Sequence, residues 1–216
     1  MNLARRVGDG IPVISIITTV YNRVSCLARC IQSVRSLDFR NHEHILVADC
    51  PPRNILSNLK RLVEASQEKS NVMLASLARR ENDWGITPAF LGLKLSQGEY
   101  VCFLSDDNGY LPHHFNRLLD ELESNPLIGF SYSSCLYDNR RILAAPIPAR
   151  KHIDLGQPLF RRRLFDEYLG GTLPFSERAW DWRMIEHFIN NGVPFSHIND
   201  ATFVFRLANY PHLWPK

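Results

Sequence analysis

Two adjacent acids close an apolar stretch near the middle of the chain. The stretch reads CFLSDDNGYLP, and Asp106 and Asp107 follow its apolar residues directly. Neighbouring carboxylates at the end of a buried strand are costly unless water or a cation compensates their charge. Carboxylate oxygens suit hard ions such as Mg²⁺ or Mn²⁺, which share their coordination shell with the phosphates of a substrate. Taken alone, two adjacent aspartates are better explained by a solvated turn. Their position after a strand of an alternating sheet instead favours a metal-binding site.

Two further acids, Asp49 and Asp181, have both a structural and a chemical explanation. Asp49 ends the segment LVADCPP, where it can cap a turn or accept a hydrogen bond from a nucleobase or ribose. Asp181 lies between two tryptophans in AWDWRM, near the start of an expected helix. The helix dipole favours an acid there, and the aromatic rings also make a dry setting for a general base beside a sugar ring. The residue types alone leave both questions open.

Other reactive side chains give weaker signals. The run Arg161–Arg163 could attract phosphates or nucleic acid, but a solvated helix face explains it more simply. The eight histidines include no HxxxH pair, so we do not expect a zinc site. The chain has five cysteines, an odd number, and no CxxC pair. This favours reduced, mostly buried thiols over disulfides.

The composition is that of a globular protein. The chain has 216 residues, of which 45% are hydrophobic and 22% charged, and its net charge of +3 does not by itself indicate a nucleic-acid partner. No apolar run approaches the ~20 residues of a membrane span, and the start MNLARRVGDG lacks the apolar centre of a signal peptide. We therefore expect a protein without a transmembrane segment in a reducing compartment, the cytoplasm.

Strands and helices alternate over the first two thirds of the chain. Apolar and β-branched runs predict strands at PVISIITT (12–19), HILVAD (44–49), NVMLAS (71–76), GEYVCFLS (98–105) and IGFSYSS (128–134). Apolar residues at helical spacing predict helices at about 24–36, 55–63 and 87–95, with Thr87 as an N-cap, and after Pro112. This alternation predicts an α/β fold with a mostly parallel sheet flanked by helices. Tyr21, Asp49 and the acid pair should then face one crevice beyond the strand ends.

From about residue 136 the pattern becomes irregular. YDNRRIL (137–143) is typical of a hairpin turn, and PLFRRRLFDEYLGG (158–171) of a short helix closed by glycine. SERAWDWRMIEHFINNG (176–192) predicts a helix, and ATFVFRL (201–207) predicts a last strand. Because the sequence contains no low-complexity linker and no internal repeat, we expect a single domain over residues 1–216.

Taken in order, these segments resemble the family-2 glycosyltransferases of the GT-A fold. ISIITTVYNR is similar to the family's opening strand and turn, CIQSV to its first helix and HILVADCPP to its second strand. GLKLSQGEYVCFLSDDN resembles the segment with the metal-binding DxD element, WDWRMIEHFINNGVPFSHI the stretch with the catalytic acid, and ATFVFRLANYPH the closing motif. The resemblance covers nearly the whole chain and implies a single GT-A-type, Rossmann-like domain. Its nucleotide-sugar-binding half would span about 11–110, and its acceptor-side half about 111–216.

The resemblance also implies roles for particular residues. Asp107 would hold a divalent metal, Mn²⁺ or Mg²⁺, that bridges the diphosphate, and Asp181 would be the general base. The remaining contacts to the nucleotide sugar would come from Thr19, Tyr21 beside the base, Asp49 on the base, usually uracil, and Asp106 at the ribose. The implied reaction is an inverting single displacement on a nucleotide-diphosphate sugar, with a UDP-sugar favoured. The acceptor stays open among a glycan, a lipid-linked sugar, a protein and a modified nucleic acid.

The chain departs from the family pattern in three places. SDDN replaces a strict DxD, and Phe90 and Leu91 stand where the family usually has an arginine, which Arg79 or Arg80 would have to replace. The chain also stops soon after the last motif. We therefore expect a small acceptor site, or completion by a partner subunit such as a second copy in a homo-oligomer.

Two other functions remain as alternatives. A nucleotidyltransferase on a similar sheet would also use metal-bound carboxylates, but it usually needs a glycine-rich phosphate loop, and TTVYNRVSC contains no glycine. A non-catalytic or degenerate module that binds a nucleotide sugar or a carbohydrate is the other alternative, and the missing arginine favours it.

Overall fold

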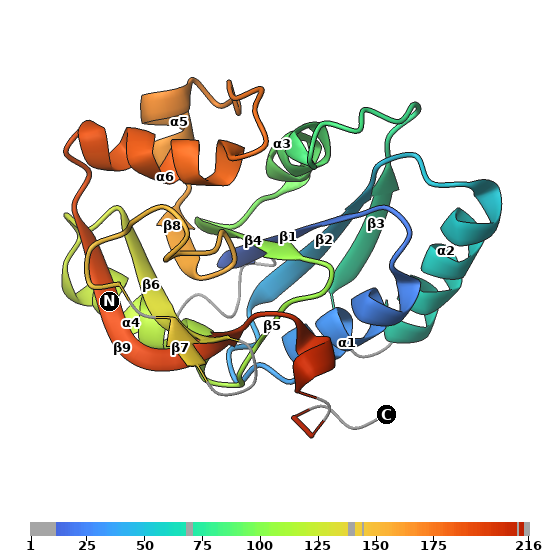
Figure 1. Ribbon diagram of the computed structural model, residues 1–216, viewed down its shortest axis with the longest axis horizontal. Coiled ribbons are helices and arrows are strands. Elements are labelled where there is room, and N and C mark those ends of the chain that lie inside the picture. The colour runs from blue at the N-terminus through green and yellow to red at the C-terminus, as the bar shows by residue number, and fades with distance from the viewer. Residues whose placement is uncertain (1–11, 68–70, 138–140, 144, 211, 214–216) are drawn as a thin grey trace.

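The computed structural model describes residues 12–67, 71–137, 141–143, 145–210 and 212–213, which form one sheet between two layers of helices (Figure 1). The first half is built as the apolar pattern predicts. Its strands are β1 (Ile14–Val20), β2 (His42–Ala48), β3 (Val72–Ser76) and β4 (Tyr100–Ser105). The intervening helices are α1 (Val24–Arg35), α2 (Arg53–Gln67) and α3 (Ile86–Leu95). These four strands pair in parallel, in the order β3-β2-β1-β4.

The second half continues the same sheet with strands of both directions. In chain order it contains β5 (Gly109–Tyr110), α4 (His114–Ser124), β6 (Phe130–Tyr137), β7 (Arg141–Leu143), β8 (Pro158–Arg161), α5 (Arg163–Leu169), α6 (Trp180–Asn190), β9 (Phe195–Val204) and a 3-10 turn at Leu207–Asn209. β8 pairs antiparallel with both β4 and β6. β9 runs parallel to β6 and pairs antiparallel with β5 at the far edge. The parallel arrangement therefore describes the first half, and the sheet as a whole is mixed.

Two apolar clusters hold the helices against the two faces of the sheet. Because side chains alternate along a strand, Ile14 and Ile16 of β1 enter one cluster while Ile17 enters the other. Residues of α1, α2 and α4 belong to the first cluster, and residues of α3, α5 and α6 belong to the second. A strand that is buried on both faces needs a continuously apolar sequence, which explains the run PVISIITT.

β8 is a strand that the sequence analysis had included in a helix. The helix of that segment begins only at Arg163, and Gly170 in the left-handed conformation (φ +59°) closes it as predicted. Leu159 and Phe160 of β8 are fully buried in the sheet. A strand of only four residues is too short to show the sequence period by which strands are identified.

The start of α3 also differs from the prediction. The helix begins at Ile86, so Thr87 is its second residue and not its N-cap. The carboxylate of Asp83 accepts hydrogen bonds from the Thr87 N–H (2.9 Å) and hydroxyl (2.5 Å) and takes over the capping role. Gly85 has a φ of +86°, and a Cβ added there would lie 3.1 Å from Thr19 Oγ1. The glycine therefore lets the loop before α3 approach the end of β1 closely.

Several smaller predictions can be compared with the structure. β7 pairs antiparallel with β6, which confirms the hairpin, while its turn (138–140) lies outside the described residues. β9 begins at Phe195, well before the predicted start at residue 201. All five cysteines are free, and Cys30, Cys102 and Cys135 are buried, as expected. Within the described ranges, every helix is too short or too polar to cross a membrane.

Candidate active site

Asp106 and Asp107 follow the carboxyl end of β4, and a cation from another element contacts both of them. The guanidinium of Arg23, from the turn between β1 and α1, contacts Asp106 Oδ1 through Nη2, and Asp107 Oδ2 through Nη1 at 2.5 Å. Asp106 is 2% exposed, and burial raises the pKa of its carboxyl to about 6 although Arg23 acts in the opposite direction. A well-solvated turn is therefore wrong for Asp106, whereas Asp107 keeps 25% of its side chain exposed.

The chain segment after β9 closes over this acidic turn. The N–H of Leu207 donates to the carbonyl oxygen of Asp107 at 2.7 Å, and the N–H of Arg206 donates to Asn108 Oδ1 at 2.9 Å. Arg206 has a φ of +54°, which is uncommon for a residue other than glycine. Its guanidinium carbon lies 5.1 Å from the centroid of the Phe205 ring. Arg206 lies in the closing motif ATFVFRLANYPH, and its contact with Asn108 of the acidic turn is evident only in the folded chain.

Asp49 and Tyr21 lie beyond the ends of β2 and β1, as predicted. Asp49 is 9% exposed, and its two oxygens accept hydrogen bonds from the N–H groups of Glu81 (2.8 Å) and Asn82 (3.0 Å). The carboxylate thus holds the distant loop between β3 and α3, whereas the structural role considered from the sequence was a local cap ahead of the next helix. The contact between Asp49 and a nucleobase stays a prediction.

Arg80 is the arginine that the structure brings to Tyr21. Its guanidinium carbon lies 4.0 Å from the centroid of the Tyr21 ring, and its Nη2 donates to Asn82 Oδ1 at 2.9 Å. Arg79 instead forms an exposed ion pair within the same loop. Phe90, at the place of the family arginine, packs against the apolar cluster of α3, α5 and α6. Arg79 and Arg80 were the two candidates to replace the family arginine, and of these two only Arg80 packs on the ring of Tyr21.

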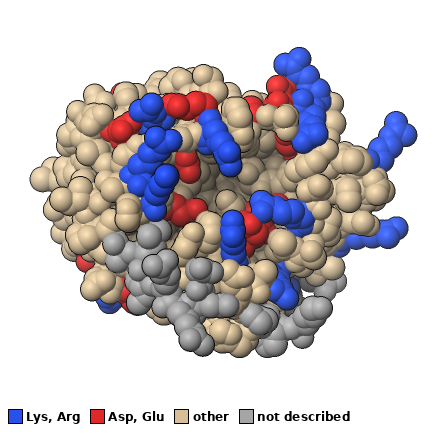
Figure 2. All heavy atoms as spheres, viewed as in Figure 1, with Lys and Arg blue, Asp and Glu red and all other residues tan. Residues whose placement is uncertain are grey.

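A cavity of about 150 Å³ joins the ends of β1 and β4 to the start of α6. Thr19 and Asp181 both line this cavity, together with apolar side chains of β1, α3 and β4. Trp84 and Trp180 also line it, and Trp180 Nε1 donates to the carbonyl oxygen of Trp84 at 3.2 Å. The Trp84 residue remains 59% exposed. Figure 2 shows a hollow in this face of the molecule, with charged side chains of both signs around it.

Asp181 lies in the first turn of α6, and it lines the cavity. Its Oδ1 accepts a hydrogen bond from the N–H of Trp182 at 2.8 Å. Burial raises the pKa of the Asp181 carboxyl, and the hydrogen bond from Trp182 and the positive charge of Arg150 offset this only in part. A carboxyl group with a raised pKa in the wall of a cavity is suited to proton transfer.

Asp154 is a residue of the site that the sequence analysis missed. Its segment HIDLGQ carries no motif, and the structure places it in the same cavity wall as Asp181. Its Oδ1 accepts a hydrogen bond from the Gly156 N–H at 2.9 Å and lies 3.5 Å from Asn108 Nδ2. Burial raises the pKa of Asp154 to about 6, and the negative charges of Asp181 and Asp107 add to this shift. The site therefore concentrates negative charge that a cation can offset.

Replacing Asp154 by asparagine is expected to stabilise the protein above pH 6. The raised pKa means that the folded protein binds this proton more tightly than the unfolded chain, whose carboxyl titrates near ~3.9. Stability is therefore lost as the pH rises through about 6, and Asp154→Asn avoids that loss. Denaturant unfolding should show a gain of about 1 to 2 kcal/mol at pH 8 that shrinks at pH 5.

The matched control is Asp120→Asn, at an exposed position of α4. It should change the free energy of unfolding by less than about 0.5 kcal/mol at either pH. An equal gain for both variants, or a gain for Asp154→Asn that does not depend on pH, would contradict the assignment of charge strain to Asp154.

Asp106 and Asp107 present hard oxygen donors next to each other after β4. No group of three or more His, Cys, Asp or Glu side chains in the described part of the chain is arranged to hold a metal by itself. Asp106 and Asp107 nevertheless fit a cation, because the guanidinium of Arg23 already lies against both carboxylates. Hard divalent ions in nucleotide sites commonly bind one or two carboxylates and complete their shell with phosphates and water.

Comparisons with known sequences identify relatives along most of the chain. The family described as Glycosyl transferase family 2 matches residues 15–207. A Haemophilus influenzae protein named as an uncharacterized glycosyltransferase is 27% identical over 121 residues, which cover 56% of this chain and 38% of that protein. An Escherichia coli K12 protein named as the colanic acid biosynthesis glycosyl transferase WcaA is 23% identical over 203 residues, or 94% of this chain and 69% of that protein.

Solved structures share the fold. The structure of Staphylococcus aureus TarS 1–349 has a TM-score of 0.72 at 17% identity, covering 93% of this chain and 62% of that chain. The mannosyltransferase PcManGT from Pyrobaculum calidifontis, solved with GDP-Man and Mn²⁺, has a TM-score of 0.73 at 18% identity, covering 91% and 57%. The GT-A-type fold that the resemblance implied is thereby confirmed. Since the family match extends over most of its length, this chain belongs to glycosyl transferase family 2.

Proposed function

We propose that the protein is a glycosyltransferase that moves a sugar from a nucleotide-diphosphate sugar, with a UDP-sugar favoured, to an acceptor hydroxyl. The reaction would be a metal-dependent, inverting single displacement. The observation that carries the proposal is the cavity in which Asp181 and Thr19 share a wall with Ser105, the residue that leads into the acid pair. Membership of the family supports it. So do neighbours of the same fold that were solved with UDP-GlcNAc or with GDP-Man and Mn²⁺.

Asp181 takes the role of general base. In an inverting displacement the acceptor hydroxyl attacks the anomeric carbon while the nucleoside diphosphate leaves from the opposite face. One catalytic carboxylate therefore suffices, whereas glycoside hydrolysis uses two. Asp181 removes the hydroxyl proton, and the raised pKa of its carboxyl makes it a stronger base than an exposed aspartate. The hydrogen bond from the Trp182 N–H engages Oδ1 and leaves Oδ2 for the proton.

The donor side is formed by the half of the chain at about 11–110. Asp107 would hold a divalent ion, Mn²⁺ or Mg²⁺, and such an ion would offset charge on the leaving diphosphate. The guanidinium of Arg23 contacts the carboxylates of both Asp106 and Asp107. The half at about 111–216 would receive the acceptor next to Asp181. The other donor contacts are proposed for Thr19, Tyr21, Asp49 on the base and Asp106 at the ribose.

Nucleotide binding is the first test of the proposal. Thermal shift and calorimetry with uridine, guanosine and thymidine diphosphates should show Mn²⁺-dependent stabilisation, largest for uridine diphosphate. Asp49→Ala should weaken uridine diphosphate binding about tenfold, because it removes the charged carboxylate that would accept a hydrogen bond from the base. Pyrophosphate, which has no base, should bind this variant as it binds the wild type. Equal losses for both ligands would show that Asp49 acts through the loop at Glu81 and Asn82 alone, and no stabilisation by any nucleotide would contradict the proposed donor.

The rate of sugar transfer should also fall at low pH, and the midpoint of this fall should reflect the pKa of Asp181. A base must be deprotonated, so kcat/KM for the donor should fall as the pH drops through the pKa of Asp181. Because burial raises this pKa, the midpoint should lie above the ~3.9 of an ordinary aspartate. Arg150→Ala should move the midpoint further up, because the positive charge of Arg150 lowers the pKa. A midpoint that is unchanged in Arg150→Ala would argue that another group controls the profile.

A non-catalytic binding module remains a second candidate, because the partly buried Phe90 occupies the place of the family arginine and packs against the apolar cluster of α3, α5 and α6. Such a module would bind the nucleotide sugar and leave it intact. Release of nucleoside diphosphate from any tested donor, with or without an acceptor, would exclude it.

A further inference from the structure

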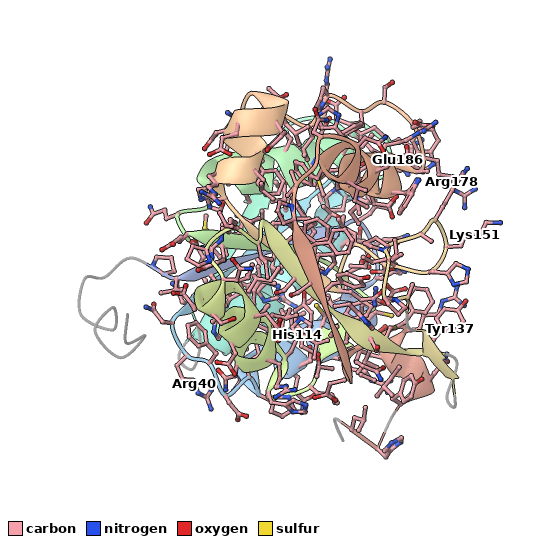
Figure 3. The ribbon with its side chains drawn as sticks, turned by 90° about the vertical axis from the view of Figure 1, so that its left-hand side faces the viewer. Arg40, His114, Tyr137, Lys151, Arg178 and Glu186 are labelled. Carbon is pink, nitrogen blue, oxygen red and sulfur yellow. The ribbon has the colours of Figure 1, made fainter. Side chains whose placement is uncertain are left out.

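Three cations lie close in sequence to the two acids of the cavity wall, Asp154 and Asp181. Arg150 and Lys151 belong to the segment before β8, and Arg178 belongs to the segment before α6 and lines the cavity together with Asp181. Figure 3 shows Lys151 and Arg178 projecting from the same edge of the molecule as Glu186. Figure 2 shows that Lys and Arg side chains gather around the hollow. We call Arg150, Lys151 and Arg178 the acceptor-side rim.

Two acids near Arg178, Glu177 and Glu186, are paired with Arg183. Arg183 contacts Glu177 Oε1 through Nε at 2.6 Å and Glu186 Oε2 through Nη1 at 2.8 Å. Among the residues that the structure describes, neither Lys151 nor Arg178 has a carboxylate oxygen within 4.0 Å of its side-chain nitrogens. The charge of these two side chains is therefore available to a ligand.

The rim is distinct from the cations on the donor side. Arg23 lies against Asp106 and Asp107 at the end of β4, and Arg80 lies over the ring of Tyr21. The positive charge of Arg150, in contrast, acts on Asp181. The rim thus flanks the position at which an acceptor hydroxyl would give up its proton.

We infer that the acceptor is anionic and carries a phosphate or carboxylate group close to the hydroxyl that receives the sugar. This inference rests on the proposed function and names the substrate class of its acceptor side. Guanidinium groups bind both anions through paired N–H donors, and a lysine adds a further point charge. A basic surface beside the site also steers anionic ligands toward it, whereas a neutral glycan would leave the positive charges of Lys151 and Arg178 without a counterpart.

The test compares small acceptor probes that differ in charge. The donor site is first filled with uridine diphosphate and Mn²⁺, so that added anions cannot bind there, and glucose 6-phosphate, glucuronic acid and glucose are then titrated by calorimetry. We expect at least one anionic probe to bind about tenfold more tightly than glucose, and the difference to shrink as salt is raised. Equal affinities, or no binding of either anion at millimolar concentration, would overturn the inference. A failure of uridine diphosphate to bind in the first step would instead count against the proposed function.

Variants then locate the binding. Arg150→Ala and Arg178→Ala should each weaken binding of the anionic probe about fivefold while glucose binding stays the same, and Arg178→Lys should restore part of the loss. Arg61→Ala, at an exposed position of α2, removes the same charge elsewhere and should bind the probe as the wild type does. Equal weakening in Arg61→Ala would show that only net charge matters. If Arg178→Ala weakened uridine diphosphate as much as the probe, the rim would serve the donor diphosphate. Either result would overturn the inference.

Discussion

Asp181→Asn is expected to reduce sugar transfer by about 100- to 10,000-fold, the usual contribution of a positioned general base. The amide cannot accept the proton of the acceptor hydroxyl, but its Oδ1 can still accept the hydrogen bond that the Trp182 N–H now donates at 2.8 Å. The start of α6 and the cavity wall should therefore keep their structure. The measurement is single-turnover transfer with saturating donor, combined with calorimetric titration of uridine diphosphate.

The distinguishing feature of this prediction is a large loss of rate with nearly unchanged donor affinity. Asp154→Asn serves as the comparison, because it changes an acid of the same cavity wall that has no proposed proton to transfer. Equal losses of transfer and of nucleotide binding in Asp181→Asn would contradict the assignment of Asp181 as the base. So would a rate defect in Asp154→Asn as large as that in Asp181→Asn.

Asp107→Ala is expected to remove the Mn²⁺-dependent part of nucleotide binding and to slow transfer by roughly 100-fold or more. Asp107 is the more exposed member of the acid pair, so the variant should fold with little change in stability. Its loss also leaves Arg23 in contact with Asp106 alone. Thermal shift with uridine diphosphate, at increasing Mn²⁺, measures the effect directly.

The control for Asp107→Ala is Asp120→Ala, at an exposed position of α4 away from the strand ends. This control should retain the full Mn²⁺ response. If Asp107→Ala keeps the same Mn²⁺ dependence as the wild type, the metal is held elsewhere and the role of the acid pair is limited to its ion pairs with Arg23.

The sequence was most informative where a strand or helix shows its own period. Strands β1 to β4 could be predicted, because runs such as PVISIITT are long and apolar on both faces. The position of Asp49 and of the acid pair at one edge of the sheet followed from the parallel direction of these strands. The four residues of β8 were too few to show a period, and for that reason the reversal of direction in the second half could not be predicted.

Contacts between distant segments were beyond the reach of sequence patterns. Arg23 and Asp107 are 84 positions apart, and nothing in either segment indicates their ion pair. Asp154 joins the site because its segment packs against the cavity, although HIDLGQ carries no motif. The choice between Arg79 and Arg80 likewise depends on how one loop is folded over Tyr21.

The two hydrogen bonds that Asp49 accepts from the backbone N–H groups of Glu81 and Asn82 have an evolutionary consequence. On the proposed function, the same carboxylate recognises the nucleobase and anchors the loop that carries Arg80 and Trp84. A substitution at position 49 that alters the preferred base would also release this loop. A lineage that adopts a new donor nucleotide must therefore acquire a second, compensating substitution that anchors the loop again, and single mutations are poor routes to a change of donor.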